Sequence, residues 1–348
     1  MEKTDEIRLT QHSHGAGCGC KIAPADLEGI LAQVRPSPPC AALLVGYASR
    51  DDAAVYDLGD GRALISTTDF FTPIVDDPYD FGRVASTNAL SDVYAMGGTP
   101  LMALAILGWP VEKLGTAHAA RVIEGARWAC DRAGIPLAGG HSIDSPEPFF
   151  GLAITGQVAV ANIKRNNTAK AGDVLLLTKP LGIGVLSTAQ KRGLLLAQET
   201  DLARDVMLMP NALGAELGGI DGVHALTDVT GFGLLGHLSE MCLGSGLKAK
   251  LRYANVPMIP AGQGYAKRGI YPDGAMRNWK NVSTHTEGIQ GMEQLVMLSD
   301  PQTSGGLLIA CNEALVDVIM AFAEEYETPA SVIGSLHDAD GSKLISVE

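Results

Sequence analysis

The stretch FGRVASTNALSDVYAMGGTPLMALAIL, residues 81–107, decides the fold class. Its first part, up to Met96, places apolar residues at helical spacing and ends at a pair of glycines, a common signal for the end of a helix. The seven residues at 101–107 are all apolar, which is typical of a strand buried on both faces. A helix followed directly by such a strand predicts a layered α/β structure.

Strands and helices alternate on both sides of this stretch. Upstream, two short strands at 53–56 and 63–66 flank a Gly-Asp-Gly turn, which is a hairpin signal. Downstream, an amphipathic helix at 119–133 precedes a strand at 149–160. The first half of the chain is therefore predicted to be one α/β domain.

A polar, turn-forming segment at 164–173 separates this half from the second half. The second half predicts strands at 174–177, 223–227, 247–251, 306–311 and 331–335, and helices at 185–195, 202–217, 234–243 and 313–326. We therefore expect an α/β domain and an α+β domain. The expected boundaries are a mobile Gly/His/Cys loop at 1–22, an N-terminal domain at 23–165 and a C-terminal domain at 166–348.

Length and composition agree with two folded domains. The chain has 348 residues, of which 46% are hydrophobic, so disorder over most of its length is excluded. Lys and Arg number 26 against 39 Asp and Glu, which gives a formal net charge of −13. This charge disfavours a nucleic-acid partner that binds a basic surface. A polyanionic ligand would have to arrive with cations, and metal ions are a natural solution.

The sequence also predicts the compartment. The first 22 residues lack the apolar core of a signal peptide, and the longest apolar stretches, near 101–107 and 149–161, are too short to span a membrane. Six cysteines in 348 residues are too few for a disulfide scaffold. We expect a soluble protein of the reducing cytoplasm with no membrane partner.

The first candidate for chemistry is the run HSHGAGCGCK, residues 12–21, which contains four soft or borderline metal ligands. Its glycines predict an accessible Cys18 thiol, and the nearby Lys21 would favour the thiolate. The spacing matches no standard zinc module, so a tail without chemistry or an adventitious zinc site explains the run equally well. The residues alone leave these interpretations open.

Five aspartates form the second candidate. They lie beside expected strands or on an expected helix, with small or hydroxylic neighbours: Asp51, Asp52, Asp69, Asp92 and Asp228. Capping and turn formation explain any one of them. As a set they are harder to explain in this way, and hard oxygen ligands suit magnesium, which bridges carboxylates to substrate phosphates.

Glycine-rich segments form the third candidate. The sequences AGGHS at 138–142 and SGG at 304–306 are expected to be turns, whose backbone N–H groups could face phosphate or could serve only to connect packed elements. The sequence GFGLLG at 231–236 matches a dinucleotide fingerprint, but the next strand ends without the acid that holds a ribose. A dinucleotide site is therefore disfavoured, and no P-loop sequence occurs in the chain.

Taken together, these motifs resemble the selenophosphate synthetase (selenide, water dikinase) family. The resemblance is carried by TQHSHGAGCGCK at 10–21, RDDAAVY at 50–56, STTDFF at 66–71, GGHS at 139–142, TDVTGFGLLGH at 227–237 and DPQTSGG at 300–306. It runs from about Arg8 to Gly306 and departs from the family at no motif position.

The resemblance implies that ATP, selenide and water are converted to selenophosphate, AMP and orthophosphate. It implies the fold of aminoimidazole ribonucleotide synthetase, in which the N-terminal domain binds ATP and metal and pairs its sheet with that of its mate in a homodimer. It also implies Mg²⁺ as cofactor, and it leaves room for a monovalent cation and for a protein that delivers selenium.

The resemblance further implies roles for single residues. Cys18 would be the catalytic position, and Lys21 would contact the nucleotide phosphates and share in catalysis. The magnesium ligands would be Asp52, Asp92 and Asp228, with Asp92 also at the nucleotide. The remaining residues of the ATP site would be Ser49, Arg50, Asp51, Asp69, Gly140, His141 and Ser142.

Two other functions stay open from the sequence. A different ATP-using enzyme of the same fold would share the aspartates but not the His-rich loop that carries Cys18 and Lys21. A non-catalytic metal or selenium carrier would use His12, His14 and the cysteines of the loop, and would need no ATP. Selenide-dependent AMP formation would distinguish a selenophosphate synthetase from the other ATP-using enzyme. Magnesium-dependent ATP turnover would distinguish it from the carrier.

Overall fold

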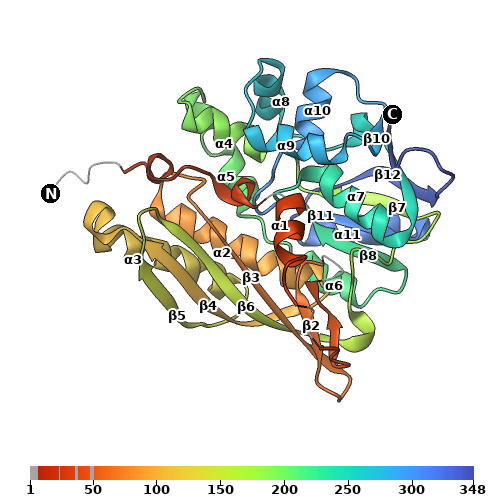
Figure 1. Cartoon of the computed structure of the whole chain (residues 1–348), viewed down its shortest axis with the longest axis horizontal. Helices are drawn as coiled ribbons and strands as arrows, with labels where there is room; N and C mark the ends of the chain where they lie inside the picture. Colours follow the sequence, from red (N-terminus) through yellow and green to blue (C-terminus); the bar gives the residue numbers. More distant parts are fainter. Residues whose placement is uncertain (1–6, 23, 36–37, 48–50) are drawn as a thin grey trace.

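The computed structural model describes residues 7–22, 24–35, 38–47 and 51–348. Two sheets with their helices make up the molecule, one from each half of the chain (Figure 1). The first sheet has the strand order β1-β2-β3-β6-β4-β5 and is antiparallel except for the parallel pair β4–β5. Its strands are β1 Leu43–Val45, β2 Ala54–Asp57, β3 Arg62–Phe71, β4 Thr99–Trp109, β5 Leu137–Asp144 and β6 Phe149–Ala159.

Two long helices pack on one face of this sheet, α2 (Pro78–Ala95) and α3 (Val111–Arg132). Helix α2 begins at Asp77, whose carboxylate accepts the backbone N–H of Asp80, and Pro78 occupies the first turn. Most of α2 is buried, because it contacts β3 and β6 on one side and β8 and α6 of the other half on the other side. The helix therefore presents side chains to both halves of the molecule.

The opposite face of the first sheet carries exposed apolar side chains: Leu43, Tyr56, Phe70, Leu101, Leu104 and Ile143. For a single chain, the prediction that residues 101–107 form a strand buried on both faces is therefore wrong. Helices α2 and α3 pack on the same face, so within one chain β4 is covered on one side only. The strand itself was predicted in the right place.

The second sheet has the order β10-β13-β9-β12-β7-β11-β8. Its strands are β7 Val174–Thr178, β8 Val223–Asp228, β9 Leu247–Leu251, β10 Thr286–Glu287, β11 Leu307–Cys311, β12 Ala330–Asp338 and β13 Ile345–Val347. Only the pairs of β13 with β9 and β10 are parallel. The five strands predicted for this half are confirmed, and β10 and β13 were missed.

Helices surround the second sheet (Figure 1). They are α4 Ile183–Lys191, α5 Leu202–Met207, α6 Leu213–Gly218, α7 Gly233–Ser245, α8 Pro260–Lys267, α9 Asp273–Val282, α10 Gly291–Ser299 and α11 Val316–Glu325. The single helix predicted at 202–217 is two helices, because Pro210 lies between α5 and α6 and cannot continue a helix.

The N-terminal segment packs against both halves. It forms two short 3₁₀ turns, η1 (Leu9–His12) and η2 (Gly17–Cys20), before helix α1 (Pro24–Leu31). Leu9 is fully buried, and the backbone N–H of Gly17 donates to the carbonyl of Thr72 at the end of β3. This packing places η2 between the two sheets.

No helix in the described part of the chain is both long enough and apolar enough to cross a membrane.

The crossing of α2 and α3 depends on close backbone contact. A Cβ on Gly82 would lie 1.9 Å from the carbonyl oxygen of Val122, so Gly82→Ala must push the helices apart. We expect a loss of about 1–3 kcal/mol in the free energy of unfolding, measured by urea denaturation.

Gly264 of α8 is the matched control, because a Cβ there meets no atom within 4 Å. Gly264→Ala should be neutral or stabilising by about 0.5–1 kcal/mol, since alanine is the better helix former. Equal effects of the two substitutions would contradict the packing described for Gly82.

Candidate active site

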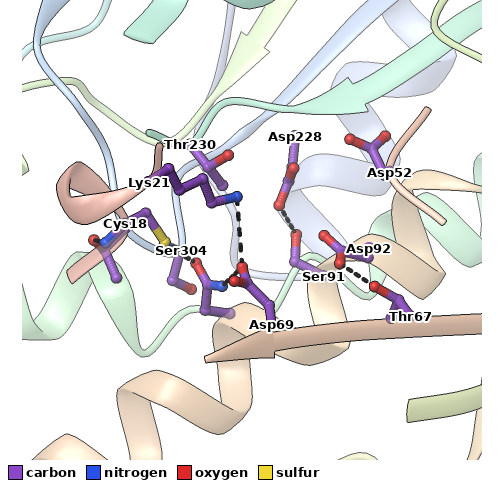
Figure 2. A network of polar contacts seen from close by, with 12 residues as sticks. Cys18, Lys21, Asp52, Thr67, Asp69, Ser91, Asp92, Asp228, Thr230 and Ser304 are labelled. Carbon is purple, nitrogen blue, oxygen red and sulfur yellow. Dashed lines mark hydrogen bonds and ion pairs between the residues drawn. The ribbon is translucent and has the colours of Figure 1, made fainter. Parts of the chain in front are cut away.

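Polar side chains from both halves of the molecule meet between the two sheets (Figure 2). We call this group the polar cluster; its charged or reactive members are Cys18, Lys21, Asp52, Asp69, Asp92 and Asp228. Cys18 lies in η2, Lys21 directly follows it, and Asp52 lies just before β2. Asp69 lies in β3, Asp92 in α2 and Asp228 at the end of β8. The structure thus brings together residues more than 200 positions apart.

Asp52 lies just before β2 and reaches the other half of the molecule. Its Oδ1 accepts a hydrogen bond of 2.9 Å from the hydroxyl of Thr227 on β8. Its Oδ2 is buried and has no hydrogen-bond partner among the described residues. A buried carboxylate oxygen without a partner is costly, and a bound cation would satisfy it.

Asp92 and Asp228 are each held by one hydroxyl group. Thr67 of β3 donates to Asp92 Oδ2 at 2.5 Å, and Ser91 of α2 donates to Asp228 Oδ2 at 2.6 Å. The Ser91 hydroxyl is itself fixed, because Asn211 Nδ2 donates to it at 2.7 Å. Single hydroxyl contacts orient the carboxylates without neutralising their charge.

The carboxylates strongly disfavour one another's ionisation. Burial raises the pKa of Asp52, and the charges of Asp228 and Asp92 raise it further. Burial also raises the pKa of Asp92 and of Asp228, and the charge of Asp69 adds to both shifts. Positive charge placed among these residues would therefore be bound favourably.

Within the described residues, no three His, Cys, Asp or Glu side chains converge closely enough to bind a metal ion by themselves. This arrangement fits magnesium better than it fits zinc, because Mg²⁺ is usually held by one or two carboxylates together with substrate phosphates and water. The unsatisfied Asp52 Oδ2 supports the fit.

Lys21 supplies positive charge to the cluster. Its Nζ lies 3.8 Å from Asp69 Oδ2, and the same oxygen accepts Asn88 Nδ2 at 2.6 Å. Partial removal from water by itself lowers the pKa of Lys21, whose side chain is 40% exposed, but the charges of Asp69, Asp92 and Asp228 outweigh this effect and raise it. Lys21 is therefore a cation at neutral pH.

Cys18 is held from two sides. Its backbone N–H donates to Thr303 Oγ1 at 3.0 Å, and its thiol donates to Asn88 Oδ1 at 3.3 Å. The same Asn88 oxygen accepts the backbone N–H of Ser304 at 2.7 Å. Asn88, a residue of α2, thus contacts both the loop before β11 and η2 (Gly17–Cys20), which we call the N-terminal turn.

The thiol of Cys18 differs from what the sequence predicted. It is 1% exposed, so the prediction of an accessible thiol is wrong for this arrangement. Burial raises the pKa of Cys18, the charge of Asp69 raises it further, and the opposing effect of Lys21 is smaller. The thiol is therefore protonated at neutral pH, and the glycines around it permit close packing rather than exposure.

The sequence GFGLLG at 231–236 serves this packing. A Cβ on Gly231 would lie 2.5 Å from the carbonyl oxygen of Cys18, so only glycine lets the N-terminal turn approach. In a dinucleotide site the glycines make room for a pyrophosphate. Here the chain's own backbone occupies that space, which explains the match without a dinucleotide.

The sequence predicts a turn at Gly139 and Gly140, but both residues lie in a strand. Gly140, His141 and Ser142 lie within the edge strand β5, and a Cβ on Gly140 would lie 2.1 Å from the carbonyl oxygen of Ala105 on β4. Strand β5 is separated from β3, which carries Asp69, by three strand spacings, roughly 14 Å. Within one chain these residues do not join the polar cluster.

Three further predicted residues lie near position 50. Ser49 and Arg50 lie outside the described residues. Asp51 is described: its Oδ1 accepts the backbone N–H of Asn166 at 2.8 Å, and its charge is one of those that raise the pKa of Asp52.

Several side chains of the site had no predicted role. Asn88 and Ser91 could have been found, because they are polar residues on an otherwise apolar helix. Thr303 lies in the motif DPQTSGG, which carried the resemblance without giving this residue a role, and Asn211 gave no comparable signal.

Lys179 also had no predicted role, although it is almost fully buried. Its Nζ donates to the carbonyls of Met209 and Ser304, at 2.7 and 2.9 Å. Burial lowers the pKa of Lys179 to about 7, while the charge of Asp228 opposes the shift. The side chain fixes the loop that contains Ser304.

The raised pKa of Asp52 predicts a stability effect. A carboxyl whose pKa is higher in the folded state costs stability above that pKa, and the cost falls as pH falls toward the unfolded value. Asp52→Asn keeps the acceptor for Thr227 and removes the charge, so we expect a higher Tm at pH 8 without nucleotide or metal. In a chain of this size, each kcal/mol gained in the free energy of unfolding should raise Tm by at most about 4 °C.

Asp338→Asn is the control, because Asp338 is exposed at the end of β12. Differential scanning calorimetry from pH 8 to pH 4 should show a gain for Asp52→Asn that shrinks with acidity, and no gain for the control. A lower Tm for Asp52→Asn at pH 8 would contradict the proposed repulsion.

Family models, sequence relatives and solved structures all match this chain. The chain matches the family model of AIR synthase related protein, N-terminal domain, over residues 50–158, and that of the C-terminal domain over residues 170–347. A selenide, water dikinase of Photorhabdus laumondii subsp. laumondii is 54% identical over 340 residues, which cover 98% of both chains. The enzyme of the same name from Cronobacter sakazakii is 56% identical over 337 residues, which cover 97% of both chains.

Solved structures resemble the fold. A thiamine-monophosphate kinase from Stenotrophomonas maltophilia K279a matches with a TM-score of 0.65 and 20% identity, covering 94% of this chain and 96% of the other. The hydrogenase maturation protein HypE matches with a TM-score of 0.67 and 20% identity, covering 89% of this chain and 91% of the other. At this identity the likeness concerns the fold alone.

Proposed function

The chain belongs to the selenide, water dikinase family, and from this membership we propose how its residues share the work of the reaction. It is an enzyme that makes selenophosphate from selenide, ATP and water and releases AMP and orthophosphate. The observation in the structure that best supports this function is the gathering of four carboxylates beside Lys21 and Cys18, three of which, Asp69, Asp92 and Asp228, raise the pKa of Lys21. A carrier that needs no ATP would have no use for these carboxylates.

We propose that Asp52, Asp92 and Asp228 hold Mg²⁺ together with the phosphates of ATP. Their mutual repulsion and the unsatisfied Asp52 Oδ2 support this role. When bound, the metal neutralises phosphate charge and orients the phosphoryl groups for transfer. Without cations, an ATP triphosphate would be repelled by a chain of net charge −13.

Lys21 is proposed to contact the phosphates from the opposite side, next to Asp69. Its ammonium group stabilises the negative charge that spreads over the oxygens of the transferred phosphoryl group. Asn88 is a positioning residue, since it donates to Asp69 and accepts from the Cys18 thiol. Ser49, Arg50 and Asp51 complete the nucleotide site in this proposal.

The packed N-terminal turn is proposed to exclude water during the first phosphoryl transfer. Water that reached the reacting phosphoryl group would hydrolyse ATP without capturing selenium. Because the Cys18 thiol is buried and protonated in this arrangement, the turn has to shift before Cys18 can meet selenium as a thiolate.

We propose that the enzyme is a homodimer formed through the first sheet. The exposed apolar residues on its open face, among them Leu101 and Leu104, support this assembly. Gly140, His141 and Ser142 lie too far from Asp69 within one chain, so their proposed contact with ATP would be made in the site of the second copy. We keep the domain boundaries 1–22, 23–165 and 166–348 as part of the proposal.

The remaining predictions concern the surroundings of the enzyme. We propose a cytoplasmic location, which is supported by five free cysteines in the described part of the chain: Cys18, Cys40, Cys130, Cys242 and Cys311. A monovalent cation and a selenium-delivery protein stay predictions from the family resemblance.

Phosphorus NMR of the protein with ATP, magnesium and selenide tests the function directly. We expect selenophosphate, AMP and orthophosphate to appear together and only when all three components are present. ATP turnover that ignores selenide would assign the chain to a different reaction of this fold.

The metal proposal predicts the behaviour of Asp228→Asn. The variant keeps an oxygen for the Ser91 hydroxyl but loses a charge, so we expect at least about tenfold weaker magnesium-dependent ATP binding with the fold intact. Titration of ATP at several magnesium concentrations measures this, with Asp338→Asn as the control. Wild-type magnesium dependence would remove Asp228 from the proposed metal site.

Cys18→Ser tests the chemical role of the thiol. We expect normal folding and ATP binding but no selenophosphate, because a serine hydroxyl at neutral pH cannot replace a thiolate as a soft nucleophile or selenium ligand. Cys20→Ser, two residues away, is the control and should be milder. If Cys18→Ser made selenophosphate at the wild-type rate, the turn would act only as a cover over the site.

A further inference from the structure

A cavity of about 470 Å³ opens beside the N-terminal turn, where that turn faces helices α4 and α9. Gly19 and Thr303 line it, and Thr303 is the residue that accepts the backbone N–H of Cys18. None of the aspartates of the polar cluster lines it. The cavity therefore approaches the turn that carries Cys18 by a route separate from the carboxylates.

The lining of this cavity is positively charged. Lys191 and Arg192 at the end of α4 and Arg277 of α9 line it, and the one acid in its lining is Asp273. A second acid, Glu147, pairs with the lining residue His14 and interacts with Lys191. Three cations in one cavity stand out in a chain of net charge −13. The cavity would attract small anions, whereas the polar cluster would repel them until cations are bound.

Two of the three cations contact the backbone of the N-terminal segment. Lys191 Nζ donates to the carbonyl of Ser13 at 3.1 Å, and Arg277 Nη2 donates to the carbonyl of Gly19 at 3.2 Å. These contacts use only part of the three and five donors that the two side chains carry. Arg192 is exposed, and its guanidinium makes no hydrogen bond or ion pair with any described residue.

We propose that this cavity is the docking site of the selenium substrate, taken up as the small anion hydrogen selenide. The inference rests on the proposed function. Selenide is a monoanion at neutral pH, because hydrogen selenide is a stronger acid than a thiol. The cavity provides positive charge next to Gly19, the neighbour of Cys18, and has room for the anion with its hydration shell. ATP and selenium thus enter from regions of opposite charge.

Arg192→Gln is the sharpest test, because Arg192 lines the cavity and makes no hydrogen bond or ion pair to the described part of the N-terminal segment. Anaerobic initial rates of AMP formation are measured with selenide varied at saturating ATP, and then with ATP varied at saturating selenide. We expect the KM for selenide to rise at least about fivefold, while kcat and the KM for ATP stay within about twofold. Arg192→Lys keeps the charge and should restore the KM for selenide.

Two further variants complete the design. Lys280→Gln removes the same charge from an exposed position of α9 that does not line the cavity, and it should leave the KM for selenide unchanged. Arg277→Gln should raise the KM for selenide and, through its lost contact with Gly19, can also lower kcat.

If Arg192→Gln leaves the KM for selenide unchanged, or if Lys280→Gln raises it equally, the cavity is not the docking site. If Arg192→Gln leaves the KM for selenide unchanged and Arg277→Gln lowers only kcat, the cations serve only to hold the N-terminal segment in place. A wild-type protein that forms no AMP in response to selenide would instead contradict the proposed function.

Discussion

Repulsion among carboxylates that are buried or half-buried is the constraint on which the rest of the structure depends. Asp52, Asp69, Asp92 and Asp228 would separate if the chain let them, since burial and mutual charge raise the pKa of three of them. Helix α2 is fixed between the two halves and presents Asn88, Ser91 and Asp92 to the cluster. The fold therefore holds a charge arrangement that is unfavourable until cations arrive, as is common where a protein binds phosphates and metal.

The fold was largely readable from the sequence, because periodicity and glycine or proline signals are local. The strands at 149–160 and 223–227 and the helix that ends at Met96 are examples. What escaped prediction depended on partners distant in the chain. Residues 101–107 are apolar on both faces, but no local signal says that both helices cover the same face.

The site shows the same division. The aspartates could be picked out as a set, because each lies beside an expected strand or on an expected helix. The protonation of Cys18 could not, because it depends on the burial of the thiol in the folded chain and on the charge of Asp69. Proximity to Lys21 in sequence suggested a thiolate, whereas proximity to Asp69 in space outweighs it. The assignment of residues 140–142 to the site stays a prediction, because within one chain they lie on the edge strand β5, away from the polar cluster.

The contacts of Cys18 also set an order of events during synthesis. Cys18 leaves the ribosome before Thr303, the residue 285 positions further on against which it docks. At about 5–20 residues per second, the intervening residues take roughly 15 to 60 s to appear. Throughout that time the cysteine has no completed binding surface and is open to oxidants and to metal ions. A newly made chain thus passes through a vulnerable period that the finished molecule ends by covering its own thiol.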